Sequence, residues 1–330
     1  MTEPSEPAMD RAETLRLLEV ETAPPGTFGE LEPTAPPLTD AQGRIRLSFS
    51  RIDLYRTCPR SFRYRYVDRL PSRPSPHLSF GSSVHAALEA FHDRTLPARP
   101  DVDALLAALY EHWDASGFAD LPREEQVAFY RHAQDVLRRY HARGPLDGRR
   151  VVATEAWFEL PVAYEAVVVG SIDRVDVDDD GALHVVDYKT NRRARSRADV
   201  AGSLQLALYA LACRHLYGQL PATVALDFVA PGVTVPVALE ELDLEAARTA
   251  VLDTAAAIRA ERFPTTPNRL CDWCDHRRVC PAWSPDGEVV YGELAAEVLA
   301  RRRRLTAEVR ELRELEAGLA RVAEELHLDT

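Results

Sequence analysis

Residues 170–191 decide the fold of this chain, and they read GSIDRVDVDDDGALHVVDYKTN. Two runs rich in valine, at 167–177 and 182–188, flank the Asp-Asp-Asp-Gly sequence at 178–181. An Asp/Gly turn between two runs of β-branched residues is typical of a β-hairpin. The sequence therefore predicts two paired strands joined by a short turn.

Three charged residues of this hairpin are expected to lie close together. Asp187 and Lys189 share one face of their strand because side chains alternate, and Asp173 on the partner strand can face the same side. Two carboxylates and one ammonium on a buried sheet are costly without a compensating ion. Mg²⁺ and Mn²⁺ are hard cations that bind carboxylate, carbonyl and water oxygens. The pattern therefore predicts a divalent metal site with a lysine beside it.

Lys189 is the only lysine of the chain, since the other 39 of the 40 basic residues are arginine. Arginine is a wide, permanently charged fork, whereas lysine is a compact charge whose pKa shifts readily. A site that steers a water nucleophile or neutralises a phosphorane needs that compactness. The alternative is that Lys189 has no catalytic role: it remains by chance in an arginine-biased chain and forms an ion pair with Asp187 or Asp173. The position of the single lysine inside the motif favours the functional interpretation.

Asp173, followed by Asp-Tyr-Lys at 187–189, resembles the PD-(D/E)XK nuclease signature. The sequences Gly-Ser-Ile-Asp-Arg and Asp-Tyr-Lys-Thr are similar to the RecB-like branch, which includes the nuclease domains of RecB and AddB and the CRISPR-associated iron–sulfur nucleases. This resemblance implies a restriction-endonuclease-like α/β fold, with an αβββαβ core and a mixed sheet. It also implies metal-dependent DNA cleavage, with exonuclease action on single strands or ends favoured.

The resemblance also implies a role for each residue of the site. The carboxylates of Asp173 and Asp187 and the main-chain carbonyl of Tyr188 would hold one or two Mg²⁺ or Mn²⁺ ions. Lys189 would orient the nucleophilic water or stabilise the transition state. His85 would be a further metal ligand, because the Gly-x-x-x-His-x-x-Leu pattern around it is similar to the first nuclease motif of the branch. Without the family, a lone histidine on a helix is structural or exposed.

C-terminal to the lysine motif, four residues are candidates for positioning DNA. Gln205 and Tyr209 lie four residues apart in a predicted helix, and therefore on one helix face. The Gln-x-x-x-Tyr pattern is similar to the last RecB-like nuclease motif, whose pair contacts DNA and supports the active site. Arg192 and Arg193 belong to a basic cluster that directly follows the lysine motif. We expect this cluster to lie beside the proposed site.

The net charge of −12 is at first sight wrong for a nucleic-acid partner. The distribution of charge matters more than the sum. Residues 1–43 hold nine acidic residues and two arginines, whereas residues 44–73 hold nine arginines and two aspartates. An acidic body with basic patches beside the proposed site is compatible with DNA as the partner.

The segment 47–67, LSFSRIDLYRTCPRSFRYRYV, resembles the opening of RecB-like nucleases. Arginines interleaved with aromatic residues suit a single strand, through backbone charge and base stacking. The alternative is a solvated helix face above a buried stripe, and the two interpretations can coexist. The predicted stripe comprises Ile52, Tyr55, Phe62 and Tyr66.

The domain organisation follows from composition and periodicity. We expect residues 1–43, rich in Pro, Glu and Thr, to be disordered. Residues 44–285 would form the nuclease domain, with a helical insertion at 96–148. Residues 286–330 would form a long helical tail with leucine and valine at heptad a and d positions. The sequence leaves open whether this tail packs on the domain, self-associates, or docks a helicase or other repair protein.

Three cysteines near the end of the predicted core have metal-ligand spacing, Cys271, Cys274 and Cys280. Disulfides are not expected in a chain without an export signal, and three close thiolates need a fourth soft ligand. Cys58 is the candidate, while Cys213 lies in a helix among Leu and Ala and is expected to be buried. Zinc has the higher general frequency for C-x₂-C. However, the spacing resembles the [4Fe–4S] staple of AddB and the CRISPR-associated nucleases, which favours a structural cluster over zinc.

Residues 151–160 alternate apolar and polar side chains, which predicts the first strand of the core. Glu155 lies within this strand. It could approach the metal or the water, but a structural contact is the favoured interpretation.

Nothing in the sequence predicts export or membrane insertion. No apolar run approaches the ~20 residues of a membrane span, and no secretory signal is visible, so a cytoplasmic location is expected. Two alternatives to a nuclease are a non-cleaving module that binds DNA ends or a helicase partner, and a zinc-ribbon interaction protein. The intact trio of Asp173, Asp187 and Lys189 favours the nuclease, because a binding protein has no need of it.

Overall fold

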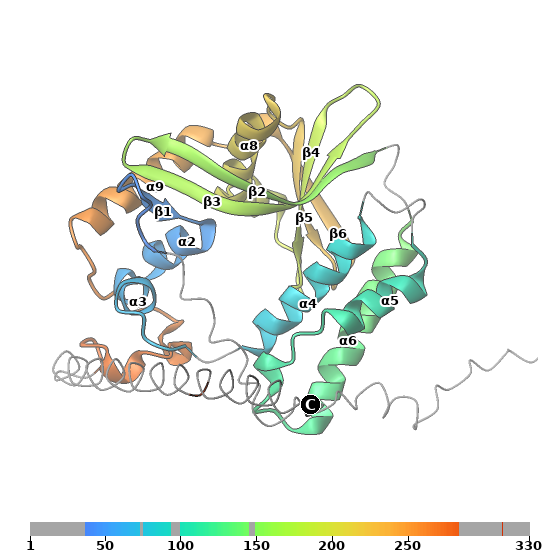
Figure 1. Cartoon of the computed structure of the whole chain (residues 1–330), viewed down its shortest axis with the longest axis horizontal. Coiled ribbons are helices and arrows are strands. Elements are labelled where there is room, and N and C mark those ends of the chain that lie inside the picture. The colour runs from blue at the N-terminus through green and yellow to red at the C-terminus, as the bar shows by residue number, and fades with distance from the viewer. Residues whose placement is uncertain (1–36, 73–74, 94–99, 145–148, 284–311, 313–330) are drawn as a thin grey trace, which may run out of the picture. The chain divides into compact units, whose positions relative to one another are not determined.

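The computed structural model describes residues 37–72, 75–93, 100–144 and 149–283, together with Leu312 (coloured in Figure 1). The predicted disorder of residues 1–43 lies mostly outside these residues. The predicted heptad tail at 286–330 lies outside them as well, except for Leu312.

The chain divides into two compact units. The first comprises Met1–Asp53 and Arg73–Ala260 and is called the sheet unit below. The second comprises Leu54–Ser72 and Glu261–Thr330 and is called the cysteine unit, because it contains Cys58 and the three cysteines at 271, 274 and 280.

A mixed six-stranded sheet forms the centre of the sheet unit, in the order β1-β3-β4-β5-β6 with β2 paired to β3. The strands are β1 (Ile45–Leu47), β2 (Arg150–Ala163), β3 (Ala166–Val177), β4 (Leu183–Lys189), β5 (Thr223–Phe228) and β6 (Val233–Ala238). The β1–β3 and β4–β5 pairs are parallel and the others are antiparallel. Helices, then β2, β3 and β4, two further helices and β5 follow along the chain, so the predicted restriction-endonuclease-like fold is confirmed.

The turn between β3 and β4 forms as the Asp/Gly pattern predicts. The carboxylate of Asp178 accepts hydrogen bonds from the N–H groups of Asp180 (3.1 Å) and Ala182 (2.8 Å). Gly181 takes a φ of +82°, which only a residue without Cβ adopts at no steric cost. Local side-chain chemistry therefore fixes this end of the hairpin.

Helices cover both faces of the sheet. On one face α4 (Pro76–Phe91), α5 (Val102–Glu111) and α6 (Arg123–Ala142) share a hydrophobic cluster with Val186, Tyr188, Val229 and Ala230. These three helices lie together in Figure 1, and α5 and α6 belong to the predicted helical insertion. On the other side α8 (Leu204–Tyr217) packs on β2, β4 and β5, and α9 (Leu244–Arg259) packs on β1, β2 and β3.

The start of α8 is set by its sequence. Ser203 caps the helix by accepting a hydrogen bond from Leu206 N–H, and Gly218 ends it in the left-handed conformation. The short helix α7 (Arg197–Ala201) precedes it and begins at a capping box of Ser196 and Asp199. These caps place Gln205 in the first turn of α8, at the end nearest the lysine motif.

The cysteine unit joins two segments that are distant in sequence. Tyr64 donates a hydrogen bond from its hydroxyl to Val279 O (3.0 Å), and Arg60 N–H donates to Pro264 O (3.1 Å). The rings of Phe62 and Phe263 stack with centroids 6.3 Å apart. Aromatic packing and main-chain hydrogen bonds thus hold the segment around Cys58 against the segment with the other three cysteines.

The residues predicted to form a buried stripe are buried at three of the four predicted positions. Ile52, Tyr55 and Phe62 are buried, but Tyr64 is buried where Tyr66 was expected. The reason is that α3 (Pro59–Phe62) continues as a π-helical turn, Arg63–Val67, which widens the helix and shifts the buried face. The buried-stripe interpretation therefore holds for most of these rings.

Among the described residues, no helix combines the length and the apolar character that a bilayer span requires.

Candidate active site

The strands β3 and β4 separate before they reach the lysine motif. Their backbone pairing ends at Arg174 and Val186, whereas β4 stays paired with β5 as far as Lys189. Asp173 lies one residue beyond the paired region, and its Oδ2 accepts a hydrogen bond from Tyr188 N–H at 2.7 Å. The carboxylate thus satisfies a main-chain donor that has lost its partner strand.

Asp187, Lys189, Gln205 and Tyr209 form a contiguous polar group. Lys189 Nζ lies 2.5 Å from Asp187 Oδ2 and donates to Gln205 Oε1 at 2.9 Å. Gln205 Nε2 lies 2.8 Å from Asp187 Oδ1 and 3.0 Å from the Tyr209 hydroxyl. The glutamine amide therefore orients both the carboxylate and the ammonium, and it does so from α8 across to β4.

One carboxylate oxygen of this group is held by charge alone. Asp187 Oδ2 is buried and makes no hydrogen bond, but Lys189 Nζ lies 2.5 Å from it as an ion pair. The ammonium group thus compensates the charge of this buried oxygen, a role that a bound metal cation would share.

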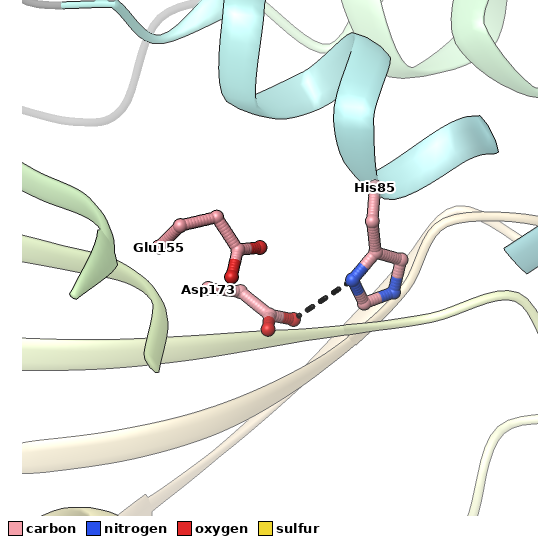
Figure 2. Close-up of side chains that lie close together, drawn as sticks. All are labelled: His85, Glu155 and Asp173. Carbon is pink, nitrogen blue, oxygen red and sulfur yellow. Dashed lines mark ion pairs between the residues drawn. The ribbon is translucent and has the colours of Figure 1, made fainter. Parts of the chain in front are cut away.

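His85, Glu155 and Asp173 form a second group, in which each residue offers a ligand atom within 4.8 Å of the others. Figure 2 shows the three side chains converging from α4, β2 and β3, with His85 Nδ1 at 3.4 Å from Asp173 Oδ2. The sequence favoured a structural contact for Glu155, whereas the structure turns its carboxylate toward the other two residues. Glu155 has a φ of +42°, a rare conformation for a residue with a side chain, and rare backbone conformations cluster at functional sites.

The electrostatics of the site favour a cation. The pKa of Asp173 lies well above its usual range, because the carboxyl group is buried and Asp187 is close to it. Burial, together with the same two aspartates, raises the pKa of Tyr209, so its hydroxyl stays protonated. Burial also lowers the pKa of His85, which leaves the imidazole neutral at pH 7 and able to bind a metal.

The donor set fits Mg²⁺ or Mn²⁺. Hard divalent cations prefer carboxylate oxygens and tolerate an imidazole, and the site offers Asp173, Asp187, Glu155 and His85. The mutual repulsion of Asp173 and Asp187 would be relieved by a bound cation. The side chain of Tyr188 points away from the site, toward α6, while its main chain contacts Asp173.

Arg192 and Arg193 are exposed in the segment that directly follows β4, three and four residues after Lys189. Their guanidinium groups are therefore open to solvent on the chain that leaves the site.

Two thiols of the cysteine unit, those of Cys280 and Cys58, lie near enough to Cys274 to affect its pKa. Burial raises the pKa of Cys274, and the neighbouring thiols of Cys280 and Cys58 raise it further. Asn268 N–H donates to Cys271 Sγ at 3.2 Å. The four cysteines are soft sulfur ligands that suit an iron–sulfur cluster or zinc. Cys213 is separate: it is buried in α8, and burial raises the pKa of its thiol to about 12.

Comparison with known proteins agrees with this geometry. The family description "PD-(D/E)XK nuclease superfamily" matches residues 46–281. The chain is 28% identical over 269 residues to the Gene 69 protein of Mycobacterium phage D29, covering 72% of this chain and 96% of that protein. For the Gene 69 protein of Mycobacterium phage L5, the identity is 26% over 297 residues, covering 74% of this chain and all of the phage protein.

A third relative is a subunit of the ATP-dependent helicase/deoxyribonuclease of Heliobacterium modesticaldum. It is 32% identical over 208 residues, which cover 52% of this chain and 17% of the relative's own length. The similarity to a helicase/deoxyribonuclease agrees with the RecB-like motifs, and the family match extends over well more than half of the chain. This protein therefore belongs to the PD-(D/E)XK nuclease superfamily.

Proposed function

We propose that this protein is a divalent-metal-dependent deoxyribonuclease that acts as an exonuclease on single-stranded or end-containing DNA. One observation carries the proposal: ligand atoms of His85, Glu155 and Asp173 lie within 4.8 Å of one another, and the Asp187–Lys189 ion pair is close by. A protein that only binds DNA gains nothing from carboxylates held close together, because their repulsion is costly without a cation.

Asp173, Asp187, Glu155 and His85 would hold one or two Mg²⁺ or Mn²⁺ ions, with the carbonyl of Tyr188 as a further ligand. A metal bound there would lower the pKa of a water molecule and neutralise charge on the scissile phosphate. The neutral imidazole of His85 contributes a nitrogen without competing for a proton.

Lys189 would orient the attacking water or stabilise the charge that develops on the phosphate. The amide of Gln205 holds its ammonium group, so its position is fixed before DNA binds. Gln205 is in turn hydrogen-bonded to Tyr209, and the two residues would together position the DNA strand. Arg192 and Arg193 would contact phosphates of the strand beside the site.

Exonuclease action and a helicase partner are proposed from the relatives. The name of the Heliobacterium modesticaldum protein joins a helicase to a deoxyribonuclease, and it aligns with this chain over 17% of its own length. This chain has no G-x-x-x-x-G-K-[ST] motif, because its single lysine is Lys189. A helicase or another repair protein is therefore a proposed partner.

Digestion of end-labelled DNA tests the function. Wild-type protein with Mn²⁺ or Mg²⁺ should degrade linear single-stranded DNA and leave circular single-stranded DNA intact. Lys189→Ala should bind the same DNA without degrading it. Cleavage of the circular substrate would replace exonuclease by endonuclease action, and binding without cleavage by the wild type would favour the non-cleaving alternative.

We also propose that Cys58, Cys271, Cys274 and Cys280 bind a [4Fe–4S] cluster rather than zinc. The cluster would be structural, because its ligands come from both segments of the cysteine unit and would tie them together. Protein purified without oxygen should be brown and should bleach with dithionite. Colourless protein that contains one equivalent of zinc would contradict the cluster.

A further inference from the structure

Two consecutive residues of β3 hold the same residue of β4 beyond the point where the strands separate. Asp173 accepts from the main-chain N–H of Tyr188 at 2.7 Å, on the side of the candidate active site. Arg174 Nη1 donates to the hydroxyl of Tyr188 at 2.8 Å, on the opposite side. Backbone pairing between β3 and β4 has ended at Arg174, so these two side-chain contacts replace it.

Arg174 also forms hydrogen bonds or ion pairs with residues outside β4. Its Nη1 donates to the hydroxyl of Tyr140 in α6 at 2.8 Å and lies 3.2 Å from His92 Nε2, directly after α4. Its Nε lies 3.0 Å from Asp176 Oδ1 in β3 itself. The guanidinium is almost fully buried, with 2% of the residue exposed. One side chain therefore connects β3, β4, α4 and α6.

The hydroxyl groups around this guanidinium also contact each other. Tyr140 Oη lies 3.1 Å from Tyr188 Oη and 2.7 Å from His92 Nε2. One arrangement satisfies all of them: Tyr188 donates to Tyr140, Tyr140 donates to His92, and Arg174 donates to both hydroxyls. Hydrogen bonds among buried groups constrain one another's geometry. The contact between Arg174 and Asp176 is an ion pair, since Arg174 Nε and both Asp176 oxygens make no hydrogen bond.

The helix that ends in this network also carries His85. His85 and His92 are seven residues apart on α4 and its C-cap, so they point to nearly the same side of the helix two turns apart. His85 approaches Asp173, and His92 approaches Arg174, the next residue of the same strand. The helix is thus held against β3 at two points, one in the site and one in the network.

We propose that Arg174 and Tyr140 are positioning residues, which fix the gap between β3 and β4 and thereby the affinity of the site for its divalent metal. The inference rests on the proposed function, because it concerns the same site. It adds that the helices of the insertion act on the site through the hydroxyl of Tyr140, although no atom of Tyr140 reaches the carboxylates.

The test is calorimetric titration of Mn²⁺ into the full-length protein carrying Tyr140→Phe. This change removes only a hydroxyl, and we expect it to raise the Kd for Mn²⁺ by about 10-fold, the lower end of the range for lost outer-shell contacts. Tyr188→Phe removes the other hydroxyl that Arg174 contacts, leaves the N–H on Asp173, and should act in the same direction. At saturating Mn²⁺, cleavage by both variants should recover toward the wild-type rate.

Tyr130→Phe is the matched control. Tyr130 lies in the same helix and is buried like Tyr140, but its ring packs edge-on against Trp113 outside the Arg174 network. This control should keep the wild-type Kd for Mn²⁺, whatever it does to the melting temperature.

A Tyr140→Phe protein that loses thermal stability but keeps the wild-type Kd would overturn the inference, since the network would then be merely structural. Wild-type protein that binds Mn²⁺ but does not cut DNA would overturn the proposed function alone. Wild-type protein that binds no Mn²⁺ would overturn both.

Discussion

The two ends of the β3–β4 pair hold their carboxylates in opposite environments. At the turn, Asp178 accepts from two main-chain N–H groups and lies 2.9 Å from His184 Nε2. These contacts, with that of His184 the largest, hold the pKa of Asp178 below its usual range. At the other end, where the two strands separate and which we call the open end, burial and the neighbouring Asp187 raise the pKa of Asp173. An aspartate is thus structural where donors surround it, and available for a metal where a second carboxylate lies beside it.

The largest expected effect is at the open end, on the ammonium group. Lys189→Ala should reduce cleavage by about 10²–10³-fold, as the loss of one transition-state donor does elsewhere. Lys189→Arg should not restore it, because a wide, planar guanidinium does not replace a compact point charge. Initial rates on linear DNA at saturating Mn²⁺ measure both variants. Cleavage by Lys189→Ala at the wild-type rate would remove the lysine from the mechanism.

Asp173→Asn should weaken Mn²⁺ binding and at the same time stabilise the metal-free protein. The folded-state pKa of Asp173 is raised, so above the unfolded pKa its ionisation opposes folding. The amide removes that cost and still accepts from Tyr188 N–H. We expect a melting temperature about 2–4 °C higher at pH 7, the shift that ~1 kcal/mol produces in a domain of this size. The gain should vanish below about pH 4, where the carboxyl is protonated in both states.

Substitutions of Glu155 test whether the backbone is strained at the open end. At a φ of +42°, Glu155→Gly should make the metal-free protein more stable than Glu155→Ala, by about 1 kcal/mol, because glycine adopts this conformation without strain. Both variants lose the carboxylate, so both should bind Mn²⁺ more weakly than the wild type. Thermal unfolding in EDTA compares their stabilities, and equal stabilities would show that the conformation is not strained.

The smallest effect is expected at the turn. Asp178→Asn should lower the melting temperature slightly at pH 7 and leave Mn²⁺ binding and cleavage unchanged. The folded-state pKa of Asp178 is lowered, so its contribution is present above the unfolded pKa and is lost as the pH falls through the folded pKa. The sign is therefore opposite to that of Asp173→Asn, and melting curves of the two variants across pH measure it. A gain in stability from Asp178→Asn would remove the contrast between the two ends.

The turn end could be predicted from the sequence, whereas the open end could be predicted only in part. Aspartates before a glycine specify the turn through local hydrogen bonds, and alternation predicts that Asp187 and Lys189 share a face, as they do. The separation of the strands has no such signal, because the valine-rich run continues through it. Nothing in the sequence marks the positive φ of Glu155, which lies where the β2–β3 register passes from Thr154–Arg174 to Ala156–Ile172.

The network around Arg174 illustrates a second limit. Arg174 is one of 39 arginines, and the sequence gives no reason to expect this one to be buried. Its partners come from positions 92, 140, 176 and 188, which only the tertiary fold brings together. The cysteines were easier to group, because three of them are close in sequence and family resemblance supplied the fourth.

The divided cysteine unit has a consequence for how the protein is made. Its first segment, Leu54–Ser72, leaves the ribosome before the whole of Arg73–Ala260 is synthesised, and only then does its second segment follow. The rings of Phe62 and Tyr64 therefore lack Phe263 and Val279 during most of translation. A prosthetic group that binds all four thiols can be completed only after Cys280 has been synthesised, and a chain that terminates before Phe263 leaves these rings without their partners.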